Sequence, residues 1–489
     1  MFEFLKTYSD TTAIIYVSKG GIEKIYSYRD LDIASSKVAN LLIKKGIHKG
    51  DRVFVYIDRS PETYFFALGI LKIGAVFCPI FSSFGPDAVK ERFIDCSGSL
   101  IITEDKLKEN VKSFPHLIID NDDFIKIFSS MDSDYISSNL NNDDIAIIHY
   151  TSGTTGKPKG AVHKLGALKS HMKTSKDVLH LVKGTNYWCT ADPAWITGTS
   201  YGIFGPLSVG AMILVSDPGY RVHQILQTLE KYKISIWYTA PTLLRMLMRQ
   251  DKSVFKDYDL SSLKKIFSVG EILSGEVFRW GVENFRLPIF DTWFQTETGS
   301  IMIANTGHFP VKSGSMGKPV EDINAAILDD SYNILDKGDI GHLAIKTPWA
   351  SMFCDYWGNN EKYKSRFHDD WYITGDLAYR DDEGYFYFVS REDDIINTAG
   401  HLLSPYEVET ILNSHPFVLE SAVVGVKDKM LGETVKAYII LKEEIKPSTK
   451  LQLDLRMLVR NRLSPFASPQ SIEFVDSIPK TESGKIIRG

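Results

Sequence analysis

The chain has 489 residues, is 44% hydrophobic and 12% aromatic, and carries a net charge of −5 from 56 basic and 61 acidic side chains. This length exceeds what one hydrophobic core supports, so two or more domains are expected. The near balance of charges excludes a broad basic surface and speaks against nucleic acid as the main partner.

Cysteine usage and the N-terminal segment indicate a cellular compartment. The four cysteines are scattered and form no CxxC pair, which excludes a zinc site or a disulfide framework of the usual spacing. The first residues, "MFEFLKTYSDTTAIIYV", lack the basic start and apolar run of a signal peptide. No apolar run approaches the roughly 20 residues that span a bilayer. We therefore expect a soluble, cytoplasmic protein with no membrane partner.

Strand-like and helix-like segments alternate along the first half of the chain. "DRVFVYI" (51–57) predicts a buried strand, "SPETYFFALGILKIG" (60–74) a helix and "AVFCPI" (75–80) another strand. Further predicted strands are 99–105, 144–150, 210–216, 234–240 and 263–270. This alternation predicts an α/β fold with layered sheets of mostly parallel strands and helices.

The pattern changes near residue 390. A polar segment, "REDDIINTAGH" (391–401), precedes a predicted helix, two strands and a last helix. About a hundred residues with their own strands and helices make a small α+β domain. We expect domains at 1–391 and 392–489.

A glycine- and hydroxyl-rich loop, "YTSGTTGKPKG" (150–160), follows a predicted strand and comes before a predicted helix, "KLGALKSHMKTSK" (164–176). In a strand–loop–helix arrangement, backbone N–H groups and the helix N-terminus hold phosphate. The spacing differs from that of a Walker A loop, because Pro158 follows Lys157. The alternative is an ordinary surface loop.

This string resembles the phosphate loop of the adenylate-forming superfamily, which includes acyl-CoA synthetases, adenylation domains of peptide synthetases and luciferases. Other segments resemble motifs of the same family in the same order: 46–53 with 67–80, then 372–401, then 478–489. The resemblance therefore covers nearly the whole chain. It implies that a carboxylate and ATP form an acyl-adenylate with release of pyrophosphate, after which the acyl group passes to a thiol.

The resemblance also implies a nucleotide site. Thr296 is expected to bind phosphate, Glu297 to bind Mg²⁺, and Asp376 and Arg391 to meet the ribose. The phosphate-loop residues are Thr151, Ser152, Gly153, Thr154, Thr155, Gly156, Lys157 and Lys159. The other ATP- or AMP-binding positions are Gly270, Glu271, Ile272, Asp291, Thr292, Trp293, Phe294 and Gln295.

The second domain carries its own implied roles. Lys485 matches the family lysine that balances charge on the α-phosphate and the substrate carboxylate. Asp393 matches a hinge between two orientations of a mobile small domain, and Gly400 with His401 matches the wall of the CoA tunnel. Leu402 departs from the family, which often has arginine there, and Ile272 stands where proline is common.

Three strings resemble the acetyl-CoA synthetase branch: 189–211, 236–248 and 291–305. By this analogy Trp195, Ile196, Thr197, Val269 and Phe294 line the acyl pocket. Phe294 stands where acetate-specific relatives usually have a larger tryptophan, so the pocket is expected to accept acetate or a slightly longer acid. Ordinary core packing is the alternative role for these apolar side chains.

The expected function is thus an ATP-dependent short-chain acyl-CoA synthetase, with Mg²⁺ as cofactor and CoA as co-substrate. Four alternatives stay open at this point: a medium-chain synthetase, an aryl acyl-CoA synthetase, an adenylating enzyme that serves a carrier protein, and a nucleotide-binding protein without catalysis. A homo-oligomer is also compatible with the sequence.

Overall fold

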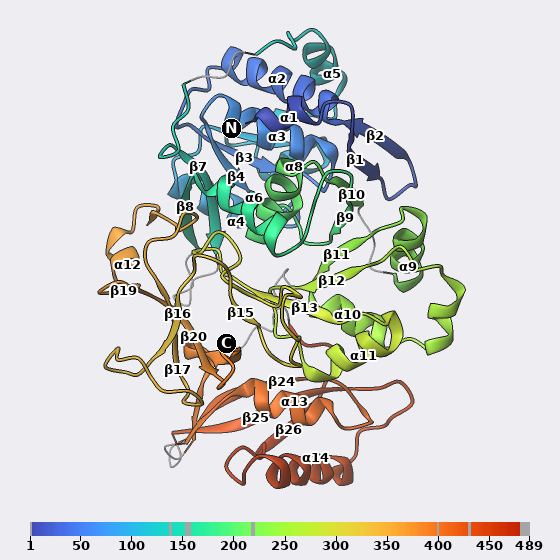
Figure 1. Ribbon diagram of the computed structural model, residues 1–489, viewed down its shortest axis with the longest axis vertical. Helices are drawn as coiled ribbons and strands as arrows, with labels where there is room; N and C mark the ends of the chain where they lie inside the picture. The colour runs from blue at the N-terminus through green and yellow to red at the C-terminus, as the bar shows by residue number, and fades with distance from the viewer. Residues whose placement is uncertain are drawn as a thin grey trace.

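The computed structural model describes residues 2–135, 139–151, 158–216, 221–398, 401–428 and 432–479. For Lys252, Asp393, Asn397, His401, Leu402 and Gly432 it describes the backbone alone. The chain forms two large sheets, a smaller antiparallel sheet, which lies at the left of the view in Figure 1, and a C-terminal domain, which lies at the bottom.

A seven-stranded sheet forms the first layer. Its strands are β3 (Arg52–Tyr56), β4 (Val76–Pro79), β5 (Leu100–Thr103), β6 (His116–Ile118), β7 (Ile145–Thr151), β8 (Lys159–Lys164) and β18 (Asp355–Tyr356). The order is β18-β8-β7-β4-β3-β5-β6, and the pairs from β7 through β6 are parallel.

A nine-stranded sheet, ordered β15-β14-β13-β12-β11-β9-β10-β1-β2, forms the second layer. Its strands are β1 (Thr12–Val17), β2 (Glu23–Ser27), β9 (Asn186–Cys189), β10 (Met212–Ser216), β11 (Ile236–Thr239), β12 (Lys265–Ser268), β13 (Ile289–Trp293), β14 (Ile303–Ala304) and β15 (Lys318–Pro319). The pairs from β1 to β13 are parallel, so the expectation of mostly parallel strands is confirmed in the centres of both large sheets.

The third sheet is antiparallel and lies beside the site. It contains β16 (Ala325–Leu328), β17 (Gly341–Lys346), β19 (Phe367–His368), β20 (Trp371–Arg380) and β21 (Phe386–Arg391). The C-terminal sheet contains β22 (Ile396–Thr398), β23 (His401–Leu403), β24 (Val418–Asp428), β25 (Gly432–Leu441) and β26 (Ser471–Phe474).

The helices cover the sheets. In the large part of the chain they are α1 (Glu3–Thr7), α2 (Tyr28–Lys44), α3 (Pro61–Lys72), α4 (Pro86–Asp95), α5 (Asp122–Ser129), α6 (Ala167–Asp177), α7 (Ile196–Thr199), α8 (Gly205–Ser208), α9 (Val222–Lys231), α10 (Pro241–Met248), α11 (Gly275–Phe285) and α12 (Asn360–Lys364). The short turns of other type are η1 (Asp105–Asn110), η2 (Ser200–Phe204, a π-helix), η3 (Lys252–Asp257) and η4 (Glu392–Asp394). The C-terminal helices are α13 (Pro405–Asn413) and α14 (Thr449–Arg462).

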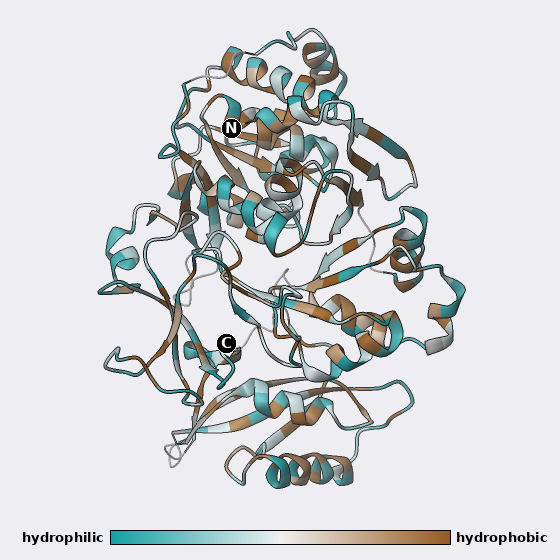
Figure 2. Ribbon diagram, in the orientation of Figure 1, coloured by the Kyte–Doolittle hydropathy of each residue, from teal (hydrophilic) through white to brown (hydrophobic). Residues whose placement is uncertain are grey.

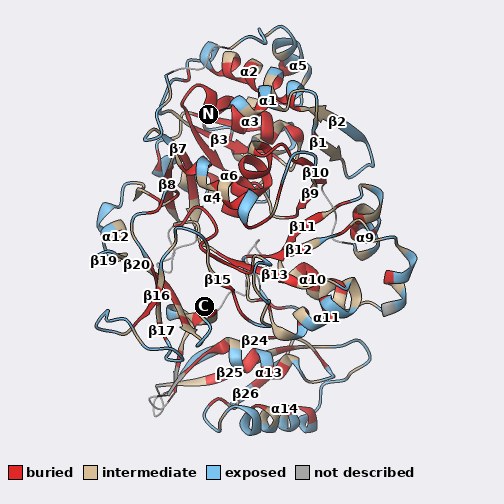
Figure 3. Ribbon diagram, viewed as in Figure 1, coloured by how far each residue is buried: buried red, intermediate tan, exposed pale blue. Residues whose placement is uncertain are grey.

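The main core lies between the two large sheets. Pro61 occupies the first turn of α3, and every residue of this helix except Glu62 is buried. A helix that is apolar all round belongs in an interior. Figures 2 and 3 show the same region as brown and red ribbon around α3, β3 and β4.

The C-terminal α+β domain predicted from the sequence is confirmed. Its sheet and two helices enclose a separate core that runs from Ile396 to Ile472. The outer face of α14 is largely exposed, as the blue segments of Figure 3 show. Among the described residues, no helix combines the length and apolarity needed to cross a membrane.

The helix predicted over 164–176 is confirmed as α6, but a strand that the sequence analysis does not predict separates it from the phosphate loop. This strand, β8, pairs antiparallel with β7 in a hairpin. The four inner residues of "KGAVHK" are all buried, and the helix α6 begins only at Ala167. The helix N-terminus therefore does not adjoin the loop.

Candidate active site

The end of β13 forms one wall of the site. Ser268, at the end of the neighbouring β12, donates a hydrogen bond to the Asp291 carboxyl group, and Thr292 donates to the Ser268 carbonyl oxygen at 2.8 Å. Burial raises the pKa of Asp291 to about 7. Parallel strands bring these polar groups together at their carboxyl ends, where ligands bind in α/β sheets.

The segment after β12 lies next to this wall. Glu271 accepts a hydrogen bond from Thr242 at 2.8 Å and is paired with Arg245, both from α10. Gly270 has a φ of +86° and Ile272 is half-buried. Glu271, one of the predicted adenine-pocket residues, is thus held by side chains of α10 that the sequence did not single out.

Three predicted nucleotide-binding residues converge on a fourth, Asp376. Its Oδ2 atom accepts hydrogen bonds from Trp293 Nε1 and Gln295 Nε2, each at 3.0 Å. Arg391 Nε lies 3.1 Å from Oδ1. The Asp376 side chain is only 4% exposed. Residues from β13, β20 and β21 therefore fix one carboxylate at the junction of two sheets.

Two tyrosines that the sequence prediction does not name as site residues hold the side chains of Glu297 and Gln295. Tyr356 donates a hydrogen bond to Glu297 Oε1 at 2.7 Å, and Tyr372 donates to Gln295 Oε1 at 2.9 Å. Burial and the nearby Glu297 carboxylate raise the pKa of both phenols above their usual range, so they stay donors. Tyr356 lies 59 positions along the chain from Glu297 and outside the family motifs, whereas Tyr372 is the first residue of the motif segment 372–401.

The segment Gln295–Ile301, here called the catalytic loop, makes a tight turn. Gly299 donates its backbone N–H to the carbonyl oxygens of Gln295 and Thr296, each at 3.2 Å. Its φ is +73°, and a methyl group there would lie 2.3 Å from the Ser351 carbonyl oxygen. Only glycine fits this position, which sets the direction of the neighbouring Thr296 and Glu297.

Three buried histidines lie beneath the loop. They are His149 on β7, His163 on β8 and His171 on α6. Burial lowers the pKa of His149 and His171 to about 3 and that of His163 to about 4, so all three are neutral near pH 7. None was expected from the sequence.

The phosphate loop itself lies mostly outside the described residues. Thr151 ends β7 and Lys159 begins β8, whereas Ser152, Gly153, Thr154, Thr155, Gly156 and Lys157 lie in the gap. Lys159 lines a groove of about 530 Å³ together with Tyr356 and Trp357. The loop thus leaves the sheet beside the tyrosine that holds Glu297.

The predicted acyl-pocket residues come from two places. Ile196 and Thr197 begin α7 and are buried, and the Trp195 ring lies 4.8 Å from that of Phe81. Val269 and Phe294 both pack against the main core, and Phe294 meets the edge of Tyr201 at 5.4 Å between ring centroids. Tyr201 belongs to η2, which directly follows α7, and its ring contacts Phe294. It therefore connects the two groups of predicted pocket residues.

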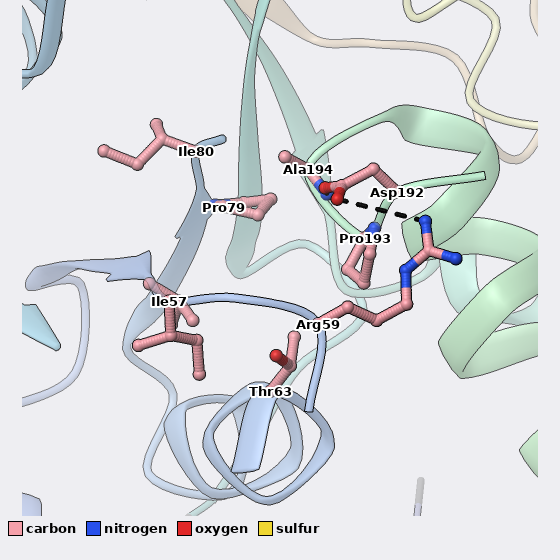
Figure 4. Close-up of a pocket in the computed structure, with 9 residues that line it drawn as sticks. Ile57, Arg59, Thr63, Pro79, Ile80, Asp192, Pro193 and Ala194 are labelled. Carbon is pink, nitrogen blue, oxygen red and sulfur yellow. Dashed lines mark hydrogen bonds and ion pairs between the residues drawn. The ribbon is translucent and has the colours of Figure 1, made fainter. Parts of the chain in front are cut away.

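An arginine secures the segment that leads into α7. Arg59 donates to the carbonyl oxygen of Thr190 at 3.0 Å and approaches Asp192 at 3.9 Å. Figure 4 shows this ion pair at the edge of a small pocket that Pro193 and Ala194 also line. The contact anchors the chain just before Trp195.

The C-terminal domain meets the large part of the chain near the nucleotide pocket. Ser404 donates to the Val389 carbonyl oxygen at 2.7 Å, and Arg249 lies 3.6 Å from Glu420. The Asp393 backbone belongs to η4 and that of His401 begins β23. Gly400 and Lys485 lie outside the described residues.

Two family models match the chain: "AMP-binding enzyme" over residues 1–357 and "AMP-binding enzyme C-terminal domain" over residues 407–485. The chain belongs to the AMP-binding enzyme family. It is similar to an acetyl-coenzyme A synthetase of Bacillus subtilis (strain 168), with 41% identity over 97% of this chain and 86% of the relative. It is 34% identical to the acetyl-coenzyme A synthetase of Escherichia coli (strain K12), over 99% of this chain and 81% of the relative.

Solved structures of this family have the same fold. The anthranilate CoA ligase AuaEII in complex with anthranoyl-AMP superposes with a TM-score of 0.90 at 27% identity, over 99% of this chain and 95% of that one. A benzoate CoA ligase from Burkholderia xenovorans LB400 gives 0.87 at 27% identity, over 99% and 97%. The protein is accordingly an ATP-dependent, AMP-forming acyl-CoA ligase that works through an acyl-adenylate, which confirms the enzyme class expected from the sequence.

Proposed function

We propose that the acid activated by this enzyme is acetate or a similarly small carboxylate. The observation that carries the proposal is the 41% identity to an acetyl-coenzyme A synthetase over 97% of the chain.

The predicted pocket walls support a small acid with some tolerance. Ile196 and Val269 are buried, and the Phe294 ring is fixed edge-on against Tyr201. Phenylalanine leaves more room than tryptophan, and an apolar pocket discriminates one methylene by only about 1–3 kcal/mol. We expect acetate and propionate to be used and longer acids to be used less well.

In the proposed reaction, a carboxylate oxygen attacks the α-phosphorus and pyrophosphate leaves. Such a transfer depends on positive charge and N–H donors near the phosphates. We assign these donors to Thr151, Lys159 and the six loop residues from Ser152 to Lys157 inclusive, together with Thr296. Lys485 is proposed to neutralise charge at the α-phosphate, with Arg391 and Asp376 at the ribose.

Glu297 fits a magnesium ion that accompanies the triphosphate. Tyr356 fixes one of its oxygens, and the other has no hydrogen-bond partner among the described residues. Mg²⁺ in such sites takes one or two carboxylates besides phosphate oxygens and water, so a single protein carboxylate suffices. The ion would supply charge neutralisation on the phosphates.

For the second step we propose domains at 1–391 and 392–489 that rotate about Asp393. One orientation would present Lys485, and the other would present Gly400 and His401 to CoA. Hinges are short segments that absorb large backbone changes, and η4 is such a segment between two sheets.

All four cysteines are free thiols, which supports a cytoplasmic location.

An aryl acid is the second candidate. The anthranilate ligase complex superposes at a TM-score of 0.90 over nearly the whole chain, and Phe294 is smaller than the tryptophan of acetate-specific relatives. A benzoate-type substrate needs a pocket that extends past Phe294.

The deciding experiment measures pyrophosphate release with ATP and Mg²⁺ over acetate to octanoate and benzoate, with and without CoA. We expect the highest kcat/KM for acetate or propionate and continued turnover only with CoA. A preference for benzoate would select the second candidate.

Lys485→Ala should abolish adenylation and spare thioester formation from supplied acetyl-adenylate. Full adenylation by this variant would overturn the role of Lys485.

Phe294→Trp tests the pocket. The larger ring should lower kcat/KM for propionate and butyrate relative to acetate by about tenfold, a difference of about 1.4 kcal/mol. Phe290→Trp serves as the control, because Phe290 lies on β13, shortly before Phe294, and outside the predicted pocket. An unchanged acid profile in Phe294→Trp would remove Phe294 from the pocket.

A further inference from the structure

The carbonyl oxygen of Gly299 points into the core and accepts two side-chain hydrogen bonds. His171 Nε2 lies 2.9 Å from it and Ser200 Oγ lies 3.1 Å from it. The two donors are also 3.1 Å apart, and both are buried, at 1% and 0% exposure. Gly299 belongs to the catalytic loop, two residues after Glu297.

The two donors come from elements outside the catalytic loop, His171 from α6 and Ser200 from η2. Ser200 is the first residue of the π-helix η2, which continues directly from α7, the helix that carries Ile196 and Thr197. π-Helical turns are rare and often occur at functional sites. The next residue, Tyr201, accepts a hydrogen bond from the Ile301 N–H at 2.8 Å. The loop is thus tied to the α7–η2 segment at both Gly299 and Ile301.

We infer that Ser200 and His171 are a positioning pair, which sets the catalytic loop at a fixed distance from the helix that carries the proposed acyl pocket. This inference rests on the proposed roles of Thr296, Glu297 and the α7 residues. Neither member of the pair touches substrate. Together they connect the part of the site assigned to phosphate with the part assigned to the carboxylate.

The chemistry of the pair suits a rigid connection. A neutral imidazole can donate from Nε2 only in the tautomer with its proton there, and burial keeps His171 neutral. The Ser200 hydroxyl donates to the same oxygen, and the single Nε2 proton of His171 is shared between that oxygen and Ser200 Oγ. The carbonyl has no access to water, so loss of both donors would leave a buried acceptor unsatisfied, which costs about 1–3 kcal/mol. The loop would relax to recover a partner.

The expected consequence is specific to one step. Adenylation requires the acid and the α-phosphorus at reacting distance, and a misplacement of about 1 Å can cost about 100-fold in rate. ATP binding depends on the nucleotide residues alone, and thioester formation begins from an acid already joined to AMP. Loss of the pair should therefore lower kcat for adenylation while the KM for ATP changes little.

The test compares two buried serines. Ser200→Ala removes one donor, and Ser200→Ala with His171→Leu removes both. Ser175→Ala is the matched control, because Ser175 on α6 is equally buried and its hydroxyl has no hydrogen-bond partner among the described residues. Acetate-dependent pyrophosphate exchange should fall about threefold to tenfold in Ser200→Ala and at least 30-fold in the double variant. Ser175→Ala should stay within twofold, and the KM for ATP should stay within about twofold in all three.

A conservative replacement separates positioning from folding. His171→Gln places an amide nitrogen near the Nε2 position and should restore most of the exchange rate that His171→Leu loses. Thermal midpoints identify any variant that acts through stability, and rates are compared at least 15 °C below them. Three results would overturn the inference: equal rates for Ser200→Ala and Ser175→Ala, no recovery in His171→Gln, or a raised KM for ATP at unchanged kcat. If the unmodified enzyme releases no pyrophosphate with any acid, the proposed function fails instead.

Discussion

A carboxylate beside a polyphosphate must be held in one orientation to share a metal ion with it. Glu297 receives this support from Tyr356, 59 positions along the chain, through a 2.7 Å hydrogen bond. The strand β18 that carries Tyr356 pairs with β8 at the end of the phosphate loop. One tyrosine thus connects the two predicted phosphate-binding segments.

Tyr356→Phe should lower kcat/KM for MgATP by about tenfold. A hydrogen bond to a charged group contributes about 1.5–3 kcal/mol, and the freed carboxylate would rotate away from the phosphates. The control is Tyr28→Phe, which removes a buried hydroxyl that donates to Ala211 at 2.8 Å far from the site. Wild-type kinetics in Tyr356→Phe over a range of Mg²⁺ concentrations would show that Glu297 needs no such support.

The buried histidines make the fold sensitive to acid. His149 is 2% exposed, and burial lowers its pKa from 6.5 to about 3, so the unfolded chain binds a proton that the folded chain does not. Stability from this source is complete above pH 6.5 and is lost as the pH falls towards 3. His163 and His171 add to it with the same sign.

His149→Leu should therefore be relatively more stable in acid. The thermal midpoint of the variant, measured against that of the unmodified protein, should shift in its favour between pH 8 and pH 5. Asp143→Asn, an exposed substitution, is the control. The same midpoint difference at both pH values would mean that His149 is already protonated in the fold.

At the scale of elements, the catalytic loop depends on one backbone conformation. Gly299→Ala places a methyl group 2.3 Å from the Ser351 carbonyl oxygen, so the loop must move. We expect adenylation to fall by at least 100-fold with a folded protein. Gly314→Ala is a matched control, since Gly314 also has a positive φ of +80° but open space around it. Equal activity in the two variants would contradict the account of the loop.

Elements with a strong local pattern were predictable, and those set by distant pairing were not. The apolar runs that became β3, α3 and β4 were found within two residues of their ends, because each is buried on all sides. The strand β8 was missed because its hairpin partner lies across a polar loop, and six residues are too few for periodicity to separate strand from helix.

The residues of the site also divide into those that the sequence predicts and those that only the folded structure reveals. The family motifs named Asp376, Trp293, Gln295 and Arg391, which the fold brings together. Tyr356 and the three histidines belong to positions whose role exists only after the sheets pack, so no spacing in the sequence could indicate them. Support residues of this kind can be recognised only from contacts.

For the whole molecule, the relation between the two domains depends on few described contacts. Arg249 and Glu420 form a 3.6 Å pair in which Glu420 is only 12% exposed. Partly screened pairs of this kind contribute about 1 kcal/mol or less. The contact can hold one orientation of the small domain without preventing another.

Arg249→Glu should shift the balance of the two half-reactions by about twofold to fivefold, because like charges would then face each other. The ratio of the pyrophosphate-exchange rate to the rate of thioester formation from supplied acetyl-adenylate measures this shift. The double variant Arg249→Glu, Glu420→Arg should restore the original ratio. If the single variant and the double variant behave alike, the pair does not influence domain orientation.

The separate core of the C-terminal domain has a consequence for the lifetime of the enzyme. Among the residues that the structure describes, fifteen buried apolar side chains between Ile396 and Ile472 stabilise this unit, against fifty-two in the main core. A unit this small buries proportionally less surface and melts more readily. On gentle heating, the protein would therefore lose catalysis while most of its chain, including the nucleotide pocket, is still folded. A warmed sample would bind ATP without consuming it, and cooling would bring turnover back.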